Sequence, residues 1–139
     1  TNKYVNFNSM KILFLSFFLG ISSSYMAQVK KRDQGVYKGL IPAYAINTGQ
    51  DLIQVDSCVI QIKLEKTRLM IRIDNKEYEG TYKVDKKTKR IYVIYAETEY
   101  SDIKEEIILF GKDKIMTRKG LFPQPDTSLK KLTKKEVLW

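Results

Sequence analysis

The stretch from Cys58 to Asp74, CVIQIKLEKTRLMIRID, decides the fold of this chain. Ile60, Ile62 and Leu64 alternate with polar residues, and the same alternation returns from Leu69 to Ile73. A period of two places one set of side chains on each face of a β-strand. The stretch therefore predicts two half-buried strands separated by a short turn.

The same pattern continues toward the C-terminus. Turn-prone residues at 74–76, 85–89 and 111–114 separate segments rich in β-branched and aromatic residues. The predicted strands are residues 77–84, 90–97, 103–110 and 114–119. A run of six apolar residues within 90–97 indicates a strand that is buried on both sides or lies at a barrel seam.

Two further strands are expected upstream, at residues 36–38 and 52–55, and one or more helical turns at residues 127–137. Seven or eight short strands joined by short loops favour an antiparallel meander. Closure of such a meander removes its exposed edges. We predict an all-β fold: a small antiparallel up-and-down, lipocalin-like barrel or a strongly curved meander sheet, with a β-sandwich as the alternative.

The first 27 residues differ in character from the rest. Met10 and Lys11 precede an apolar run from Ile12 to Ile21 and a small-residue exit, the layout of a secretory signal peptide. The run is too short for a permanent transmembrane span, which needs roughly 20 apolar residues. A buried core helix is the alternative. We expect residues 1–9 to be an upstream extension, 10–27 a signal peptide cleaved after Ala27 or Ser24, and 28–139 a single β domain with a Lys-rich C-terminal tail. The mature domain would be periplasmic or extracellular, with no transmembrane span. Because no cysteine directly follows the apolar run, no lipid anchor is expected.

The predicted mature domain is basic. Two of the 25 Lys and Arg residues and none of the 16 Asp and Glu residues precede residue 28, which leaves residues 28–139 with a net charge of +7. An anionic cell-envelope surface is therefore a candidate partner. The alternative is that the lysines serve solubility and protect strand edges. No nucleic-acid-binding motif occurs, so nucleic acid is not expected as a partner.

The residue inventory argues against catalysis. The chain contains no histidine and one cysteine, Cys58, which removes the usual Ser-His-Asp, Cys-His and His-containing metal sites. Glu105 and Glu106 are adjacent in a predicted strand and point to opposite faces. We predict that Cys58 is a buried, inert thiol, that the protein is not an enzyme, and that it uses no metal and no cofactor.

A set of short motifs resembles the small barrel of the copper-resistance (envelope-stress) lipoproteins. The motifs run in order along residues 36–132: Tyr37-Lys38-Gly39-Leu40-Ile41-Pro42, Gly80-Thr81-Tyr82, Phe110-Gly111-Lys112-Asp113 and Gly120-Leu121-Phe122-Pro123. The family carries a Cys-x-x-Cys after the proline, where this chain has Ala43 and Ile46, and a lipid-anchoring cysteine that is missing here. The resemblance implies the barrel fold, without thiol-based copper binding or membrane tethering.

Two loops are the predicted recognition elements. The segment 39–51, GLIPAYAINTGQD, shows no alternation, and we expect it to form a flap across one barrel end, with Ile41, Ala43, Tyr44 and Ile46 at the mouth. The second loop is 120–126. A set of apolar and proline residues from both loops forms the predicted ligand- or partner-binding site: Pro42, Tyr44, Ile46, Leu121, Phe122 and Pro123. The alternative is that they only close the core. The tyrosines at 78, 82, 92, 95 and 100 are expected to line a cavity, to girdle a sheet face, or to be ordinary strand residues.

Taken together, these features predict a non-enzymatic secreted or periplasmic binding module. Its loops would recognise a protein or a small apolar ligand. The alternative is a secreted inhibitor or immunity-type protein that blocks the active site of another protein. Because large side chains dominate the inward positions, we expect a filled interior, which favours recognition by the rim and loops.

Overall fold

A computed structural model describes residues 28–139 of the chain, which form ten strands and one short 3-10 helix. The elements are η1 (Lys31–Asp33), β1 (Gly35–Ile41), β2 (Tyr44–Asn47), β3 (Leu52–Val55), β4 (Cys58–Leu64), β5 (Arg68–Ile73), β6 (Lys76–Thr88), β7 (Ile91–Thr98), β8 (Ser101–Phe110), β9 (Ile115–Arg118) and β10 (Thr127–Lys131). The predicted signal peptide and upstream extension lie outside the described residues. No helix in the described part of the chain has the length and apolar character needed to cross a membrane.

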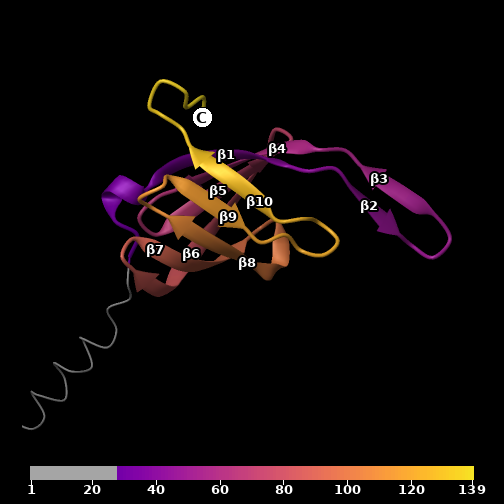
Figure 1. The fold of residues 1–139 in the computed structure, drawn as a ribbon, viewed down its shortest axis with the longest axis horizontal. Coiled ribbons are helices and arrows are strands. Elements are labelled where there is room, and N and C mark those ends of the chain that lie inside the picture. The colour runs from indigo at the N-terminus through magenta and orange to yellow at the C-terminus, as the bar shows by residue number, and fades with distance from the viewer. Residues whose placement is uncertain (1–27) are drawn as a thin grey trace, which may run out of the picture.

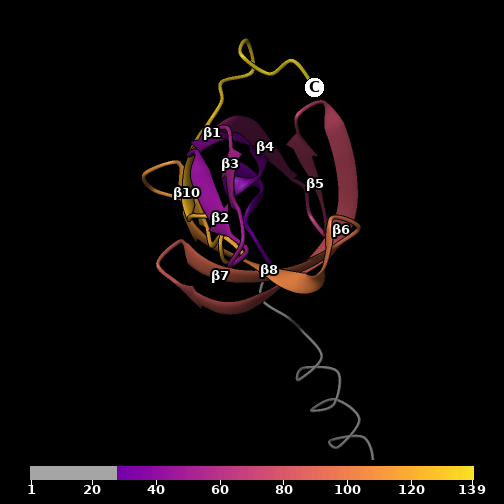
Figure 2. The ribbon, with the colours of Figure 1, turned by 90° about the vertical axis from the view of Figure 1, so that its right-hand side faces the viewer.

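Eight of the strands form a closed antiparallel barrel in the order β1-β10-β9-β8-β7-β6-β5-β4 (Figures 1 and 2). From β4 to β10, each strand pairs with the next one in the chain. The first strand, β1, closes the ring by pairing with β4 on one side and with β10 on the other. The predicted small up-and-down barrel is thus confirmed, and the sandwich alternative is wrong.

The opening stretch folds as its alternation predicts. Ile60, Ile62 and Leu64 of β4 and Leu69 and Ile71 of β5 are all buried. The turn after β5 consists of Asp74 and Asn75, with φ angles of 50° and 67°. Two consecutive left-handed residues form the hairpin turn whose twist matches that of the strands.

The next turn lies farther along the chain than the sequence predicts. Strand β6 continues to Thr88, with a register shift between Val84 and Lys86, and the turn is formed by Lys89 and Arg90, with φ angles of 48° and 65°. Most of residues 85–89, which have the composition of a turn, therefore lie at the bulged end of a long strand. A bulge of this kind accommodates one extra residue and increases local twist.

The C-terminal segment also differs from expectation. Residues 127–131, predicted as part of a helical turn and a lysine-rich tail, form β10, the strand that closes the barrel. Thr127 and Leu129 are buried whereas Ser128 and Lys130 are exposed, so the lysines occupy the outward positions of a strand. After β10 the chain runs over the outside of the barrel, where the Trp139 ring lies 4.3 Å from the Arg72 guanidinium carbon.

The barrel interior is filled by large side chains. Several of the largest are fully buried, among them Tyr37, Ile60, Ile62, Ile71, Tyr92, Ile94, Ile107 and Leu109. Of the five tyrosines considered as a cavity lining or girdle, Tyr92 is buried, Tyr78, Tyr82 and Tyr100 are half-buried, and Tyr95 is exposed. They therefore do not form one continuous surface.

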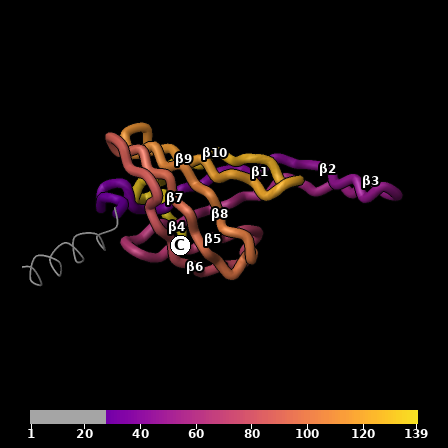
Figure 3. Tube along the Cα trace, turned by 90° about the horizontal axis from the view of Figure 1, so that it is seen from below, coloured from indigo at the N-terminus to yellow at the C-terminus, as the bar shows by residue number. Residues whose placement is uncertain are grey.

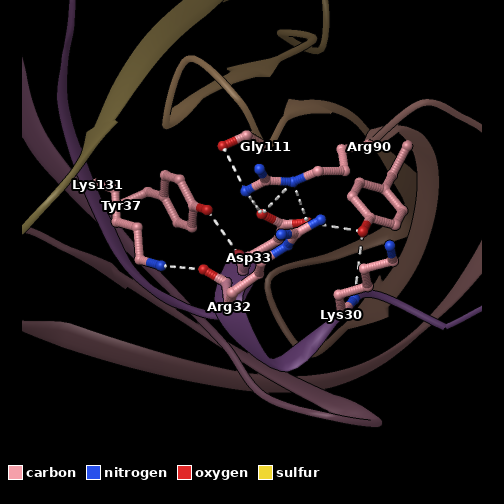
Figure 4. A network of polar contacts seen from close by, with 8 residues as sticks. Lys30, Arg32, Asp33, Tyr37, Arg90, Gly111 and Lys131 are labelled. Atoms are coloured by element: carbon pink, nitrogen blue, oxygen red, sulfur yellow. Dashed lines mark hydrogen bonds and ion pairs between the residues drawn. The ribbon is translucent and has the colours of Figure 1, made fainter.

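One end of the barrel is closed by the segment 28–34, which includes η1. Asp33 is buried at this end and accepts hydrogen bonds from the Tyr92 hydroxyl, at 2.7 Å, and from the Arg90 guanidinium (Figure 4). Its backbone carbonyl accepts a 2.6 Å hydrogen bond from the Tyr37 hydroxyl, and Lys131 Nζ donates to the carbonyl of Arg32. We call this end the basal end. These bonds join the N-terminal segment to strands β1, β7 and β10.

The electrostatics of this network favour an ionised Asp33. Burial alone would raise the pKa of the Asp33 carboxyl, but the hydrogen bonds from Arg90 and Tyr92 outweigh it and lower the pKa below its ordinary value. Burial, together with the neighbouring Asp33 carboxylate, raises the pKa of Tyr37. The network is a fully hydrogen-bonded structural anchor.

Candidate binding surface

The most unusual feature of the barrel is a two-stranded arm that projects from the end opposite the basal end (Figures 1 and 3). The arm comprises residues 42–57, with β2 and β3 paired to each other. Its pairing continues the register of the β1–β4 ladder: Ile41 faces Cys58, Tyr44 faces Val55, and Asn47 faces Leu52. One long hairpin therefore begins in the barrel wall and ends well outside it.

This geometry corrects the expected flap. The segment 39–51 spans the end of β1, all of β2 and the turn at the tip, and it leads away from the barrel mouth instead of across it. Ile41 is buried in the barrel wall, whereas Pro42 and Ala43 are exposed at the root of the arm. The alternation is hidden in the sequence because β2 is only four residues long.

The tip of the arm is held by local hydrogen bonds. The Thr48 amide and hydroxyl donate to the carbonyl of Asp51, at 3.0 and 3.1 Å, and the Asp51 amide donates back to the Thr48 hydroxyl. The Gly49 amide donates to Asn47 Oδ1, and Gly49 has a φ of 87°, a conformation that favours glycine. The tip is therefore a defined turn.

One face of the arm is apolar. Tyr44 pairs with Val55 and Ile46 with Ile53, so these four side chains share a face. Ile53 is 48% exposed, whereas Tyr44 packs partly against the barrel core. Among the described residues, neither edge of the arm is paired with another strand. The arm thus presents an apolar face and unpaired backbone groups.

The second predicted loop lies at the same end. The antiparallel order places residues 119–126, between β9 and β10, beside the root of the arm (Figure 1). Phe122 is 98% exposed, and Leu121 and Pro123 are half-buried. The peptide bond between Phe122 and Pro123 is cis. Of the predicted site residues, Pro42, Tyr44 and Ile46 lie on the arm and Leu121, Phe122 and Pro123 on this loop, so the structure brings both groups to one end.

A buried ion pair anchors this loop from inside the barrel. Arg118, the last residue of β9, donates to both carboxylate oxygens of Glu105, at 3.0 and 2.9 Å, and both side chains are fully buried. The same guanidinium donates to Gln124 Oε1 at 2.6 Å. A Cβ on Gly120 would lie 2.1 Å from the Gln124 carbonyl oxygen, so only glycine fits there. These contacts restrict the conformations of the segment that carries Phe122.

Neither buried acid–base pair was found from the sequence. Glu105 does point inward and Glu106 outward, as the strand pattern predicts, but the Arg118 partner comes from a different hairpin. The Asp33–Arg90 pair joins residues 57 positions apart. For Glu105, the signal is a charged residue at an inward position of an alternating strand. Asp33 lies in η1 and Arg90 in a turn, so no such signal exists for that pair.

The connections at the arm end are acidic. They are residues 42–57, 74–75, 99–100 and 119–126, and they contain five Asp or Glu residues against one lysine. Of these acids, Asp51 and Asp56 lie on the arm itself, and Asp126 lies on the loop that carries Phe122. A partner with complementary charge would present basic residues around an apolar centre.

Within residues 28–139, no group of three or more His, Cys, Asp or Glu side chains is placed to hold a metal ion. Cys58, at the start of β4, is half-buried instead of fully buried, and burial raises the pKa of its thiol. A raised pKa lowers the thiolate fraction at neutral pH and hence the reactivity of the thiol.

Comparisons with protein-family models, curated protein sequences and solved structures return no match to this chain. The resemblance to the copper-resistance lipoproteins remains a prediction. Its leading motif, residues 37–42, occupies β1 and the root of the arm. Ile46, at one of the two positions where that family has cysteine, lies on the apolar face of the arm.

Proposed function

We propose that this chain is a non-enzymatic, exported binding protein that recognises another protein through its arm and residues 119–126. The observation that carries the proposal is the arm itself, which leaves the barrel with an apolar face and two unpaired edges. Edge strands of this kind are normally short, charged or covered, because they pair readily with other chains. A protein partner supplies both the apolar surface and the backbone groups that such an arm can bind.

The filled interior supports a protein partner over a small apolar ligand. The side chains that a ligand would displace are fully buried, including Ile60, Ile71 and Ile107. A lipocalin-type pocket requires an open interior. Phe122, almost fully exposed on a loop held by buried contacts, is a suitable anchor, because a pre-ordered aromatic side chain loses little entropy on binding.

A second candidate function is inhibition of another protein's active site. A narrow two-stranded arm with an ordered tip has the shape required to enter a cleft, and this observation supports the hypothesis that the protein is an inhibitor. The binding-protein hypothesis and the inhibitor hypothesis both use the arm and residues 119–126 as the contact surface. They differ in whether the partner loses activity when the arm is bound.

The proposal is tested with two alanine variants, Phe122→Ala and Ile53→Ala. Each is expected to weaken binding of the partner by roughly 1–3 kcal/mol, about 5- to 150-fold, because each removes an exposed apolar group from the proposed contact. The partner is first captured from envelope extract with residues 28–139. Its affinity for each variant is then measured by titration calorimetry with the purified partner.

Matched controls come from exposed apolar residues outside this surface. Leu138, which is 85% exposed on the C-terminal tail, matches Phe122, and Tyr95, which is 37% exposed on β7, matches Ile53. Leu138→Ala and Tyr95→Ala should bind as the unmodified chain does. If all four variants bind equally well, or if the first two lose affinity only through a lower melting temperature, the proposed surface is wrong.

A further inference from the structure

The two ends of the barrel differ in charge. The connections at the basal end are residues 28–34, 65–67, 89–90 and 111–114, and they contain eight Lys or Arg residues against three Asp or Glu residues. Of the three acids, Asp33 is buried and already paired with Arg90. The arm end has the opposite sign, with five acids and one lysine. Basic charge is therefore gathered at one end of the barrel and is not spread evenly over its connections.

The basal end also has an open groove of about 820 Å³. It is lined by Gln28, Val29, Lys30, Lys31, Gln34, Lys66 and Lys87, a set without an acidic side chain. Lys30, Lys31 and Lys66 are exposed to solvent. Lys87 is held in place, with its Nζ 3.4 Å from the Gln28 carbonyl oxygen and 5.4 Å from the centre of the Tyr92 ring. The groove gathers four ammonium groups from three separate segments of the chain.

We propose that the basal end docks on an anionic phospholipid surface and thereby directs the arm away from the membrane. A surface of lipid headgroups suits this groove better than a single soluble anion. The charged side chains that line the groove are all lysines. A lysine ammonium acts as a point charge, whereas an arginine guanidinium can bind a single phosphate with two parallel hydrogen bonds. Several lysines that face a layer of anionic lipid headgroups are attracted together by the negative surface potential of the membrane.

The path of the chain is consistent with this orientation. The preceding 27 residues, which include the apolar run Ile12–Ile21, join the barrel at Gln28, on the rim of the groove. If that apolar segment stays attached, it is connected to the barrel at Gln28, on the side that is proposed to dock. If the chain is cleaved before Gln28, the new α-ammonium group adds one more positive charge to the same groove. Both forms are consistent with a basal end that faces the membrane.

The test uses residues 28–139, which contain the strands and the buried core that the structure describes. Binding is measured by co-sedimentation with vesicles of phosphatidylcholine containing about one-third phosphatidylglycerol. We expect binding that is lost with pure phosphatidylcholine and in 1 M salt, where the Debye length falls to about 3 Å. Each lysine near such a surface contributes roughly fivefold, so Lys30→Gln, Lys31→Gln and Lys66→Gln together should weaken binding by about 100-fold.

The control is a second triple variant with the same change in net charge at the other end of the barrel. Lys76, Lys104 and Lys119 are exposed and lie at or near the arm end. Replacing these three with glutamine should weaken vesicle binding by less than about threefold. Equal losses in the two triple variants would overturn the proposal, because binding would then follow net charge alone. It is also overturned if the unmodified protein binds inorganic phosphate but not the anionic vesicles. Neither result decides partner binding by the arm, because that proposal is tested separately with the Phe122→Ala and Ile53→Ala variants.

Discussion

Replacing Glu105 with alanine is expected to lower the free energy of unfolding by about 3–5 kcal/mol. Glu105 and Arg118 are fully buried and joined by two hydrogen bonds inside the barrel. The substitution leaves a buried guanidinium with the Gln124 amide as its remaining side-chain hydrogen-bond partner. An unpaired buried charge carries a large desolvation penalty, and this penalty is the source of the expected loss. Urea unfolding followed by circular dichroism measures it.

Two variants make this result specific. Glu106→Ala removes the neighbouring carboxylate, which is only half-buried, and should change stability by less than about 1 kcal/mol. The double variant Glu105→Leu with Arg118→Met removes both charges and should recover most of the lost stability, because apolar side chains of similar size replace a buried pair at little cost. A Glu105→Ala effect no larger than that of Glu106→Ala would contradict the structural role of the pair.

Asp33→Asn is expected to lower the free energy of unfolding by about 3 kcal/mol at neutral pH. The carboxylate of Asp33 accepts hydrogen bonds from Tyr92 and Arg90, and the backbone of the same segment binds Tyr37. An amide bears no charge to balance Arg90 and offers only one acceptor oxygen. The N-terminal segment should therefore detach more easily from the basal end.

The difference in unfolding free energy between the unmodified protein and Asp33→Asn is expected to depend on pH in a defined direction. The pKa of Asp33 is lowered in the folded state, so folding favours the ionised carboxylate. That contribution is fully present above the unfolded pKa of about 3.9 and is lost as the pH falls through the lower, folded pKa. The stability difference between the unmodified protein and Asp33→Asn should be constant from about pH 5 to 8 and should shrink below about pH 4. Other carboxylates titrate in both proteins and cancel in the difference. A difference that stays constant down to pH 2 would rule out the ionised role of Asp33.

The strands were predictable because their information is local. Alternation in β4 and β5 requires only that neighbouring side chains point to opposite faces, and the two-residue turn at Asp74 and Asn75 requires only local dihedral angles. The errors occurred where local composition misleads. The lysines of residues 127–131 are tail-like in composition, yet in β10 they occupy outward positions while Thr127 and Leu129 face the core.

The candidate site was predictable in part. Apolar and proline residues in two loops indicated Tyr44 and Phe122, and the structure places both loops at one end of the barrel. The shape of the site was not predictable, because the sequence of 39–51 does not show that Tyr44 would pair with Val55 and continue the barrel ladder outward. The charge difference between the ends was equally hidden, since it depends on which connections the antiparallel order brings together.

What the sequence by itself determined is the all-β class, most strand positions and the filled interior, because each follows from the period-two pattern and the sizes of the inward side chains. Only the tertiary structure decided the closure of β1 onto β10, the projection of the arm, and the pairing of Asp33 with Arg90 and of Glu105 with Arg118. The physical reason is distance along the chain. Strand pairing and buried charge pairing bring together residues from separate segments, and the free energy that selects one partner over another arises when the whole barrel closes and excludes water.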